Sequence, residues 1–421
     1  MVSSPSELDV LRENAKRLLL PAELAGWLHD WRKCSDEHVV LNSADPPPKV
    51  QGLSAKSIRN WAPRLGEAVL GILGASVSLL DLCEAGRRGA PNAPGLVVPV
   101  AYLRRCHGAA HIEKEEPAEE SANELFDRCG KQLWAQARAS TPFGFETHLL
   151  TGLTGRLRKA LAEATGKPSE DKPRLAEAFA LAAADTRRPI NEVRLSDWSG
   201  LVAALYKAAL AGALLGFQPP ATELRWRLLS VRFDGLGFIS AASRMADVLV
   251  RRDALGEALE RVRKLIEEEY PLGTEVYRDE DGSVFVVPGG PPEGPRLELM
   301  RCTSKEGATL DALLRSAVWG HQTKDLQGEM VPRLMLDDKP WWAQDPRRQL
   351  RTGPSATDGG TDSPDPGSSI EGARDEMPPV TEHLAPVMRR CDLVWLQRLW
   401  GSKSADLCSV CGLRPQASPR S

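Results

Sequence analysis

The sequence predicts an α+β protein, with a helical N-terminal region followed by a region in which strands and helices mix. Three observations support this. Ala, Leu and Arg are abundant over residues 1–215, and apolar residues recur there at helical spacing. After residue 224, strand-like and helical runs alternate. At 421 residues the chain is too long for one ordinary core, so we expect more than one domain.

Helical periodicity is clearest in three stretches of the first domain, 1–215. The stretches are residues 57–86, 145–164 and 197–217, and Asp197 or Ser199 could cap the start of the last one. A loop rich in Pro and Gly interrupts the pattern near residue 90.

Strand-like runs and helices follow one another in a recognisable order in the second domain, 224–345. We expect a strand leading into a helix, a hairpin about a turn at Asp279 to Gly282, a second helix at 309–322, and a fourth strand within 330–338. The order β-α-β-β-α-β is the ferredoxin-like arrangement, which also forms the palm of polymerases and nucleotide cyclases.

We expect two further segments in the C-terminal part of the chain. Residues 352–380 are poor in apolar residues and are expected to form a disordered linker. Residues 381–421 form a partial zinc knuckle, in which Cys408 and Cys411 have the Cys-x-x-Cys-Gly form of half a zinc ribbon. Four ligands are needed for zinc, and only Cys391 and His383 stand nearby. Either the module is cut short, a partner completes it, or the two cysteines are ordinary thiols.

Composition narrows the class of protein. No window approaches the roughly 20 apolar residues of a membrane span, and the N-terminus has no secretory h-region, so we expect a cytoplasmic protein without a membrane. Scattered cysteines fit a reducing compartment. The formal charge of −3 excludes binding nucleic acid by bulk charge alone, and the basic clusters at 155–160 and 224–233 are typical of solvated faces.

A metal site is suggested by the placement of the histidines, of which there are only seven. His29 and Asp30 are adjacent on an apolar, helical segment. His107 and His111 are four residues apart, which on a helix places both imidazoles on one face. His148 is a further candidate ligand.

The sequence around Asp30 resembles the HD motif of metal-dependent phosphohydrolases, because an apolar helix precedes His29-Asp30 and Lys33 follows. The resemblance implies that Asp30 bridges divalent cations, that histidines complete the metal shells, and that Lys33 contacts a phosphate. Asp30 and Lys33 are therefore the predicted catalytic residues. Trp31 and Arg32 depart from the small residues common at these positions.

No histidine precedes His29, and this order resembles the circularly permuted HD domain of the large subunit of type III CRISPR effector complexes. Residues 106–117 and 140–146 also resemble that family, in particular its divergent III-C-like branch, over about the first 215 residues. The resemblance implies a nuclease that cuts single-stranded DNA with Mn, Ni or Mg. It also implies other CRISPR effector subunits, guide RNA and target RNA as partners.

The same family continues with a palm, whose active members hold two Mg²⁺ on two carboxylates. Asp234 matches the first position, and Asp281 stands at the hairpin turn without the paired glycines of active members. Arg278 fills space that a phosphate needs. We therefore expect a degenerate palm with a solvated acidic turn, which makes no cyclic oligoadenylate unaided.

Two other functions stay open from the sequence. The chain could be a catalytically decayed structural subunit of the same complex, which the Trp31-Arg32 departure favours. It could also be a stand-alone HD nucleotide phosphohydrolase with an unrelated appended domain.

Overall fold

The computed structural model describes residues 6–41, 51–66, 69–72, 75–85, 97–110, 138–140, 146–148, 152–184, 192–290, 298–319, 330–338, 340 and 383–384. It mixes helices with small sheets, as expected of an α+β protein. The predicted linker, the Cys408–Cys411 pair, Cys391 and His111 lie outside the described residues.

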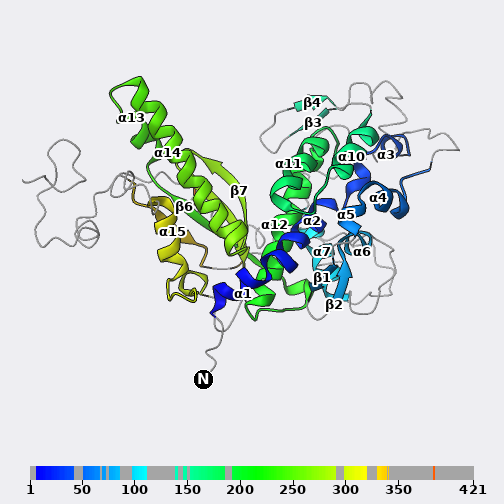
Figure 1. The fold of residues 1–421 in the computed structure, drawn as a ribbon, viewed down its shortest axis with the longest axis horizontal. Coiled ribbons are helices and arrows are strands. Elements are labelled where there is room, and N and C mark those ends of the chain that lie inside the picture. The colour runs from blue at the N-terminus through cyan, green and yellow to red at the C-terminus, as the bar shows by residue number, and fades with distance from the viewer. Residues whose placement is uncertain are drawn as a thin grey trace, which may run out of the picture.

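Helices dominate the first half of the chain, which Figure 1 shows as a cluster surrounding α12. These elements are α1 (Glu7–Asn14), the π-helical turn η1 (Ala15–Leu19), α2 (Leu20–Leu28), η2 (Trp31–Lys33), α3 (Asp36–Leu41), α4 (Ala55–Trp61), α5 (Pro63–Gly66), α6 (Leu79–Ala85), α7 (Val97–Ala109), α10 (Leu153–Ala162), α11 (Pro168–Phe179) and α12 (Leu195–Leu214). Five short strands accompany them: β1 (Val69–Ile72), β2 (Ala75–Ser78), β3 (Arg138–Ser140), β4 (Glu146–His148) and β5 (Glu192–Val193).

Parts of two stretches predicted to be helical are strands instead. Within 57–86, β1 and β2 pair antiparallel, with Val69 opposite Ser78. Within 145–164, β4 pairs with β3, and α10 begins only after Gly152, whose φ of 81° is left-handed. The run at β1 is short, apolar and contains glycine, and such a run does not distinguish strand from helix by periodicity.

The longest helix of this region, α12, is buried on almost every side. It packs against α2, α7 and α11 on the helical side and against β8 (Gly282–Pro288) on the other. A helix that is apolar all round is stable only when surrounded in this way. It begins at Leu195 with Arg194 as N-cap, so the prediction that Asp197 or Ser199 caps it was wrong.

The second half of the chain contains a four-stranded antiparallel sheet and its helices. The elements are η3 (Ala221–Glu223), β6 (Trp226–Arg232), α13 (Gly235–Ser240), α14 (Met245–Lys264), η4 (Leu265–Glu269), β7 (Thr274–Asp279), β8, η5 (Leu299–Arg301), α15 (Leu310–Trp319) and β9 (Arg333–Leu336). Their chain order is the β-α-β-β-α-β order expected from the sequence.

The sheet has the strand order β7-β8-β6-β9, so the central strands β6 and β8 are flanked by β7 and β9. Trp226 pairs with Pro288 at one end of β6, and Arg232 pairs with Gly282 at the other. Every residue of β6 and β8 is buried. The predicted hairpin is present, since β7 ends at Asp279 and β8 begins at Gly282.

A buried network of ion pairs joins the helical region to the sheet region. Lys207 of α12 and Glu23 of α2 are both fully buried, and Lys207 Nζ lies 3.0 Å from Glu23 Oε2. Lys172 of α11 donates to Glu23 (2.9 Å) and to Glu267 of η4 (3.1 Å). Because a buried charge is stable only when it is paired, this network requires both regions to be in place.

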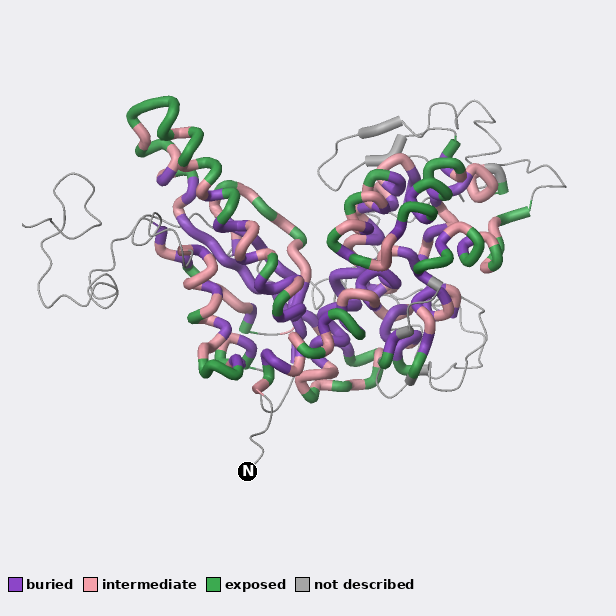
Figure 2. The backbone as a smooth tube through the Cα atoms, in the orientation of Figure 1, coloured by how far each residue is buried: buried purple, intermediate pink, exposed green. Residues whose placement is uncertain are grey.

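The tip formed by α13 and the start of α14 projects from the molecule, and Figure 2 shows it as the most exposed part of the sheet region. Met245 there is 74% exposed. None of the described helices combines the length and the apolar character needed to span a membrane.

Candidate metal centre

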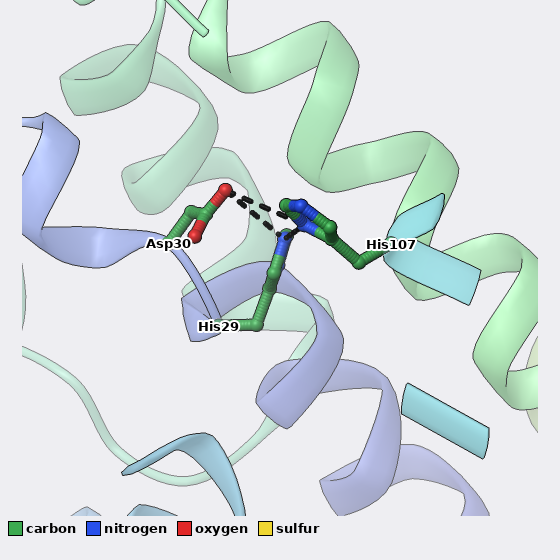
Figure 3. A group of neighbouring side chains, drawn as sticks. All are labelled: His29, Asp30 and His107. Carbon is green, nitrogen blue, oxygen red and sulfur yellow. Dashed lines mark hydrogen bonds and ion pairs between the residues drawn. The ribbon is translucent and has the colours of Figure 1, made fainter. Parts of the chain in front are cut away.

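Two helix ends bring His29, Asp30 and His107 together (Figure 3). His29 is the C-cap of α2, Asp30 follows it in the turn before η2, and His107 lies in the last turn of α7. One ligand atom from each side chain lies within 4.8 Å of the others. In the described part of the chain, this is the single group of three or more residues that could hold a metal ion.

The three side chains direct their ligand atoms at one another. His29 Nε2 lies 2.9 Å from His107 Nδ1 and 3.3 Å from Asp30 Oδ2. His107 Nδ1 lies 3.6 Å from the same carboxylate oxygen. Two imidazole nitrogens and one carboxylate oxygen form a donor set suited to Mn²⁺, Ni²⁺ or Zn²⁺, whereas Mg²⁺ prefers oxygen ligands.

A backbone carbonyl sets the tautomer of His29. Its Nδ1 lies 2.6 Å from the carbonyl oxygen of Gly26, and since a carbonyl can only accept, Nδ1 carries the hydrogen. In the neutral ring Nε2 then has a free lone pair that faces the carboxylate of Asp30. His107 Nδ1, at 2.9 Å, can donate a hydrogen to this lone pair, and a divalent cation beside the three side chains would take the place of that hydrogen.

Asp30 is held in its ionised form. Burial acts to raise the pKa of Asp30, but the neighbouring His29 and Lys33 side chains outweigh it and hold that pKa well below its ordinary value. Lys33 Nζ donates to Asp30 Oδ2 at 2.6 Å. The carboxylate is therefore a negative ligand at any pH near neutrality.

Trp198 of α12 forms a wall of the centre that the sequence did not indicate. Its ring packs edge-to-face on His107, with centroids 5.4 Å apart, and Lys33 Nζ lies 5.4 Å from the same ring. The indole thus contacts one predicted ligand and the predicted phosphate contact. It comes from a helix that begins far along the chain, so no local pattern could reveal it.

Trp31 and Arg32, which depart from the HD motif, hold the turn after Asp30 in place. The Trp31 ring is fully buried and its Nε1 donates to Glu84 of α6 at 3.1 Å. Arg32 pairs with the other oxygen of Glu84 and donates from Nε to the carbonyl of Leu53. These residues therefore anchor η2 to neighbouring elements and take no ligand position.

Close contact between α2 and α12 fixes the position of His29 relative to α12. A Cβ added to Gly26 would lie 2.6 Å from the Cα of Ala203, so the two backbones touch at this point. The same Gly26 carbonyl binds the His29 ring. Helix packing and ligand orientation therefore depend on one glycine.

The other histidines stand differently. His148 lies on β4, and the described structure does not extend to its side chain. His38 of α3, which was not among the predicted ligands, is half-buried. Burial and the charge of Lys33 lower the pKa of His38 to about 4, so it is neutral at physiological pH. Of the predicted ligands, the structure thus brings together His29, Asp30 and His107.

In the sheet region, the acidic residues near the hairpin turn form local hydrogen bonds and an ion pair. Asp234 caps α13 by accepting from the Gly237 amide at 2.9 Å, and Asp281 accepts from the Leu236 amide at 3.0 Å. Asp279 forms a two-pronged ion pair with Arg232. Among the described residues, none of these carboxylates belongs to a group of three metal ligands.

His383, considered as a zinc ligand beside Cys408 and Cys411, has both ring nitrogens engaged elsewhere. Its Nε2 lies 2.6 Å from Asp337 Oδ1 and its Nδ1 lies 3.1 Å from Ser230 Oγ. The side chain is 1% exposed. It therefore contributes no zinc ligand in this structure.

Comparison with known proteins finds a likeness among solved structures. No family model and no curated protein matches the sequence. A solved structure described as a Csm1-Csm4 cassette in complex with cA3 is similar with a TM-score of 0.48 and 15% sequence identity. The alignment covers 76% of this chain and 44% of that chain, so this chain spans less than half of that chain's length.

Proposed function

We propose that this chain is a metal-dependent phosphodiesterase that cuts single-stranded DNA. The observation that carries the proposal is the convergence of His29, Asp30 and His107. The donor set is that of a divalent-cation site, and the motif that supplies it resembles the HD phosphohydrolases. The permuted motif order further suggests the large subunit of a type III CRISPR effector.

The side chains divide the work of binding and orientation. A divalent cation held by the three ligands supplies Lewis-acid activation of water and of the phosphate. Asp30 contributes the negative charge, and the Gly26 carbonyl keeps His29 Nε2 available as a ligand. Lys33, whose ammonium lies beside Asp30 and Trp198, is placed to contact a phosphate oxygen of the substrate strand.

Sequence specificity in such a complex comes from guide RNA pairing with target RNA, which suits a chain of net charge −3. Other effector subunits are then the protein partners. We further propose that Cys408 and Cys411 supply two ligands of a zinc site.

The sheet region fits a palm that has lost catalysis. Asp234 and Asp281 bind backbone amides at the start of α13, and a Cβ on Gly235 would lie 1.7 Å from the Glu280 carbonyl oxygen. The hairpin turn therefore packs directly on α13. We expect no cyclic oligoadenylate from ATP and Mg²⁺; cyclic product made by the purified chain would contradict this.

A cleavage assay tests the nuclease. End-labelled single-stranded DNA is incubated with the full chain and Mn²⁺, Ni²⁺ or Mg²⁺. We expect Mn²⁺- or Ni²⁺-dependent cleavage that falls by roughly 1,000-fold or more in the His29→Ala/Asp30→Ala variant, because the ligands act as a unit. Asp281→Ala is the matched control and should cut normally. Hydrolysis of free nucleotides instead of DNA would favour a stand-alone phosphohydrolase.

One contact favours the alternative of a structural subunit without catalysis. Lys33 Nζ lies 2.6 Å from the Asp30 oxygen that also faces both histidines, so an ammonium already neutralises this ligand. Manganese titration followed by electron paramagnetic resonance separates the two functions. A folded protein that binds no Mn²⁺ at millimolar concentration would support the structural role and exclude the nuclease.

A further inference from the structure

A cleft of about 1260 Å³ lies between the helical region and the sheet region. Its helical wall comes from α1, η1, the start of α2 and the start of α11, and its other wall comes from α14, η4 and α15. The volume exceeds the roughly 300–1,000 Å³ of common small-molecule sites. The cleft has room for a ligand of nucleotide size or somewhat larger.

Lysines from three elements line this cleft: Lys16 of η1, Lys167 before α11 and Lys264 at the end of α14. Within the described part of the chain, Lys16 forms no ion pair. The carboxylate nearest to Lys264 is that of Glu260, at 4.0 Å, the outer limit of an ion pair. Lys167 Nζ is paired with Glu170 Oε1 at 2.9 Å, so the ammonium groups of Lys16 and Lys264 are the ones available to an anion.

Three of the four acidic residues of the lining are paired with basic side chains, and the fourth is Glu13. Glu267 is paired with Lys172 and Arg263, and Glu268 with Arg263. Glu269 is paired with Arg12. The lining as a whole carries six basic and four acidic side chains, so its net charge is positive and the cleft favours an anionic ligand.

Part of the cleft lining is apolar. Leu20, Pro21, Leu265 and Leu313 line it together with the lysines. An apolar surface beside ammonium groups matches a ligand with a flat apolar part and a compact, multiply charged part. Lys binds phosphate as a point charge, and a nucleobase can lie on aliphatic side chains.

We propose that the cleft between η1 and α14 binds a nucleoside polyphosphate, with Lys16 and Lys264 on its phosphates. The site is separate from the metal centre. Pro21 lines the cleft at the start of α2 and His29 ends that helix, about 12 Å away at 1.5 Å per residue. The inference therefore goes beyond the proposed nuclease and does not depend on it.

Equilibrium dialysis of radiolabelled ATP with the full chain tests this site. EDTA is present throughout, so that no ligand is held through a metal ion. We expect saturable binding that weakens at least tenfold in the Lys16→Glu/Lys264→Glu variant. Lys56→Glu, an equally exposed lysine on α4, is the matched control and should bind as the unchanged chain does. Asp30→Ala should also leave binding unchanged.

Several outcomes would overturn the proposal: no saturable ATP binding, equal loss in Lys56→Glu, or loss in Asp30→Ala. Binding of a thymidine oligonucleotide but not of ATP, sensitive to the same lysines, would show that the ligand class is wrong. If the charge-reversed variant has a lowered melting temperature, Lys16→Gln/Lys264→Gln gives the same test without added acidic charge, and unchanged ATP affinity in it contradicts the proposal.

Discussion

The metal centre and the acidic turn of the sheet contain similar side chains in opposite arrangements. At the centre, His29, Asp30 and His107 direct their ligand atoms at one shared point. At the turn, Asp234 and Asp281 each accept a backbone amide at the start of α13. Both places are rich in ligand groups, but at the turn the carboxylates cap a helix.

This difference shows that the chemistry of a carboxylate depends on what already satisfies it. The Asp30 carboxylate accepts from the Lys33 ammonium and also faces two imidazole nitrogens, whereas Asp281 accepts from a backbone N–H. A count of acidic residues would rank the turn above the centre. The hydrogen-bond partners reverse that ranking.

The largest effect is expected at Lys207, in the buried ion-pair network that joins the helical region to the sheet region. Lys207→Met leaves Glu23 buried with one fewer partner, and we expect a loss of about 3–5 kcal/mol in the free energy of unfolding. Urea denaturation measures it. The exposed Lys159→Met should change stability by less than about 0.5 kcal/mol. Equal effects would show that the buried network is not structural.

Acid should weaken the same junction. Burial acts to raise the pKa of Glu267, but Lys207 and Lys172 outweigh it and lower the pKa from 4.5 to about 2. A depressed pKa stabilises the fold above pH 4.5, and the contribution is lost as pH falls towards 2. The stability difference between the unchanged chain and Glu267→Gln should therefore shrink by roughly 3 kcal/mol over that window. Urea melts at several pH values measure this, and a constant difference would contradict it.

Mn²⁺ affinity can be measured after substitution at the histidine cluster and at the acidic turn. Asp30→Asn removes the only charged ligand among the three, so we expect Mn²⁺ to bind about 100-fold more weakly, equivalent to about 2.7 kcal/mol. Asp281→Asn should leave affinity unchanged. Calorimetric titration gives both values, and weaker binding in Asp281→Asn would show that the turn also holds the ion.

Substitution of Gly26 tests whether the close packing of α2 on α12 supports the histidine cluster. Gly26→Ala forces α2 away from Ala203, and we expect a loss of about 2 kcal/mol in stability together with weaker Mn²⁺ binding. Gly155→Ala, on α10 with open space around it, should stabilise by about 0.5–1 kcal/mol. Thermal melts followed by circular dichroism compare them. A neutral Gly26→Ala would mean that the helices have room to adjust.

The smallest effect is expected at Asp234. Asp234→Ala removes the cap of α13 and should cost about 1 kcal/mol without altering DNA cleavage. Urea denaturation and the cleavage assay measure the two properties. Loss of cleavage with normal stability would assign the sheet a catalytic role.

The sequence predicted the elements whose signals are local. Alternation and the Asp279–Gly282 turn predicted the β7–β8 hairpin, and helical spacing predicted α14 and α15. It failed at β1 and β2, where a short apolar run fits either structure. The candidate ligands His29 and Asp30 followed from a motif. The contacts of Trp198 with His107 and of Glu84 with Trp31 are tertiary and leave no spacing in the chain.

Burial of α12 on both sides has a consequence for dissecting the molecule. A fragment that ends before Trp226 would expose the face of α12 that packs on β8 and would leave the Leu205 carbonyl without its donor, the Trp226 indole N–H. Such a piece would tend to aggregate, because a large apolar surface would meet water. Biochemical work on the histidine cluster is therefore best done on the intact polypeptide.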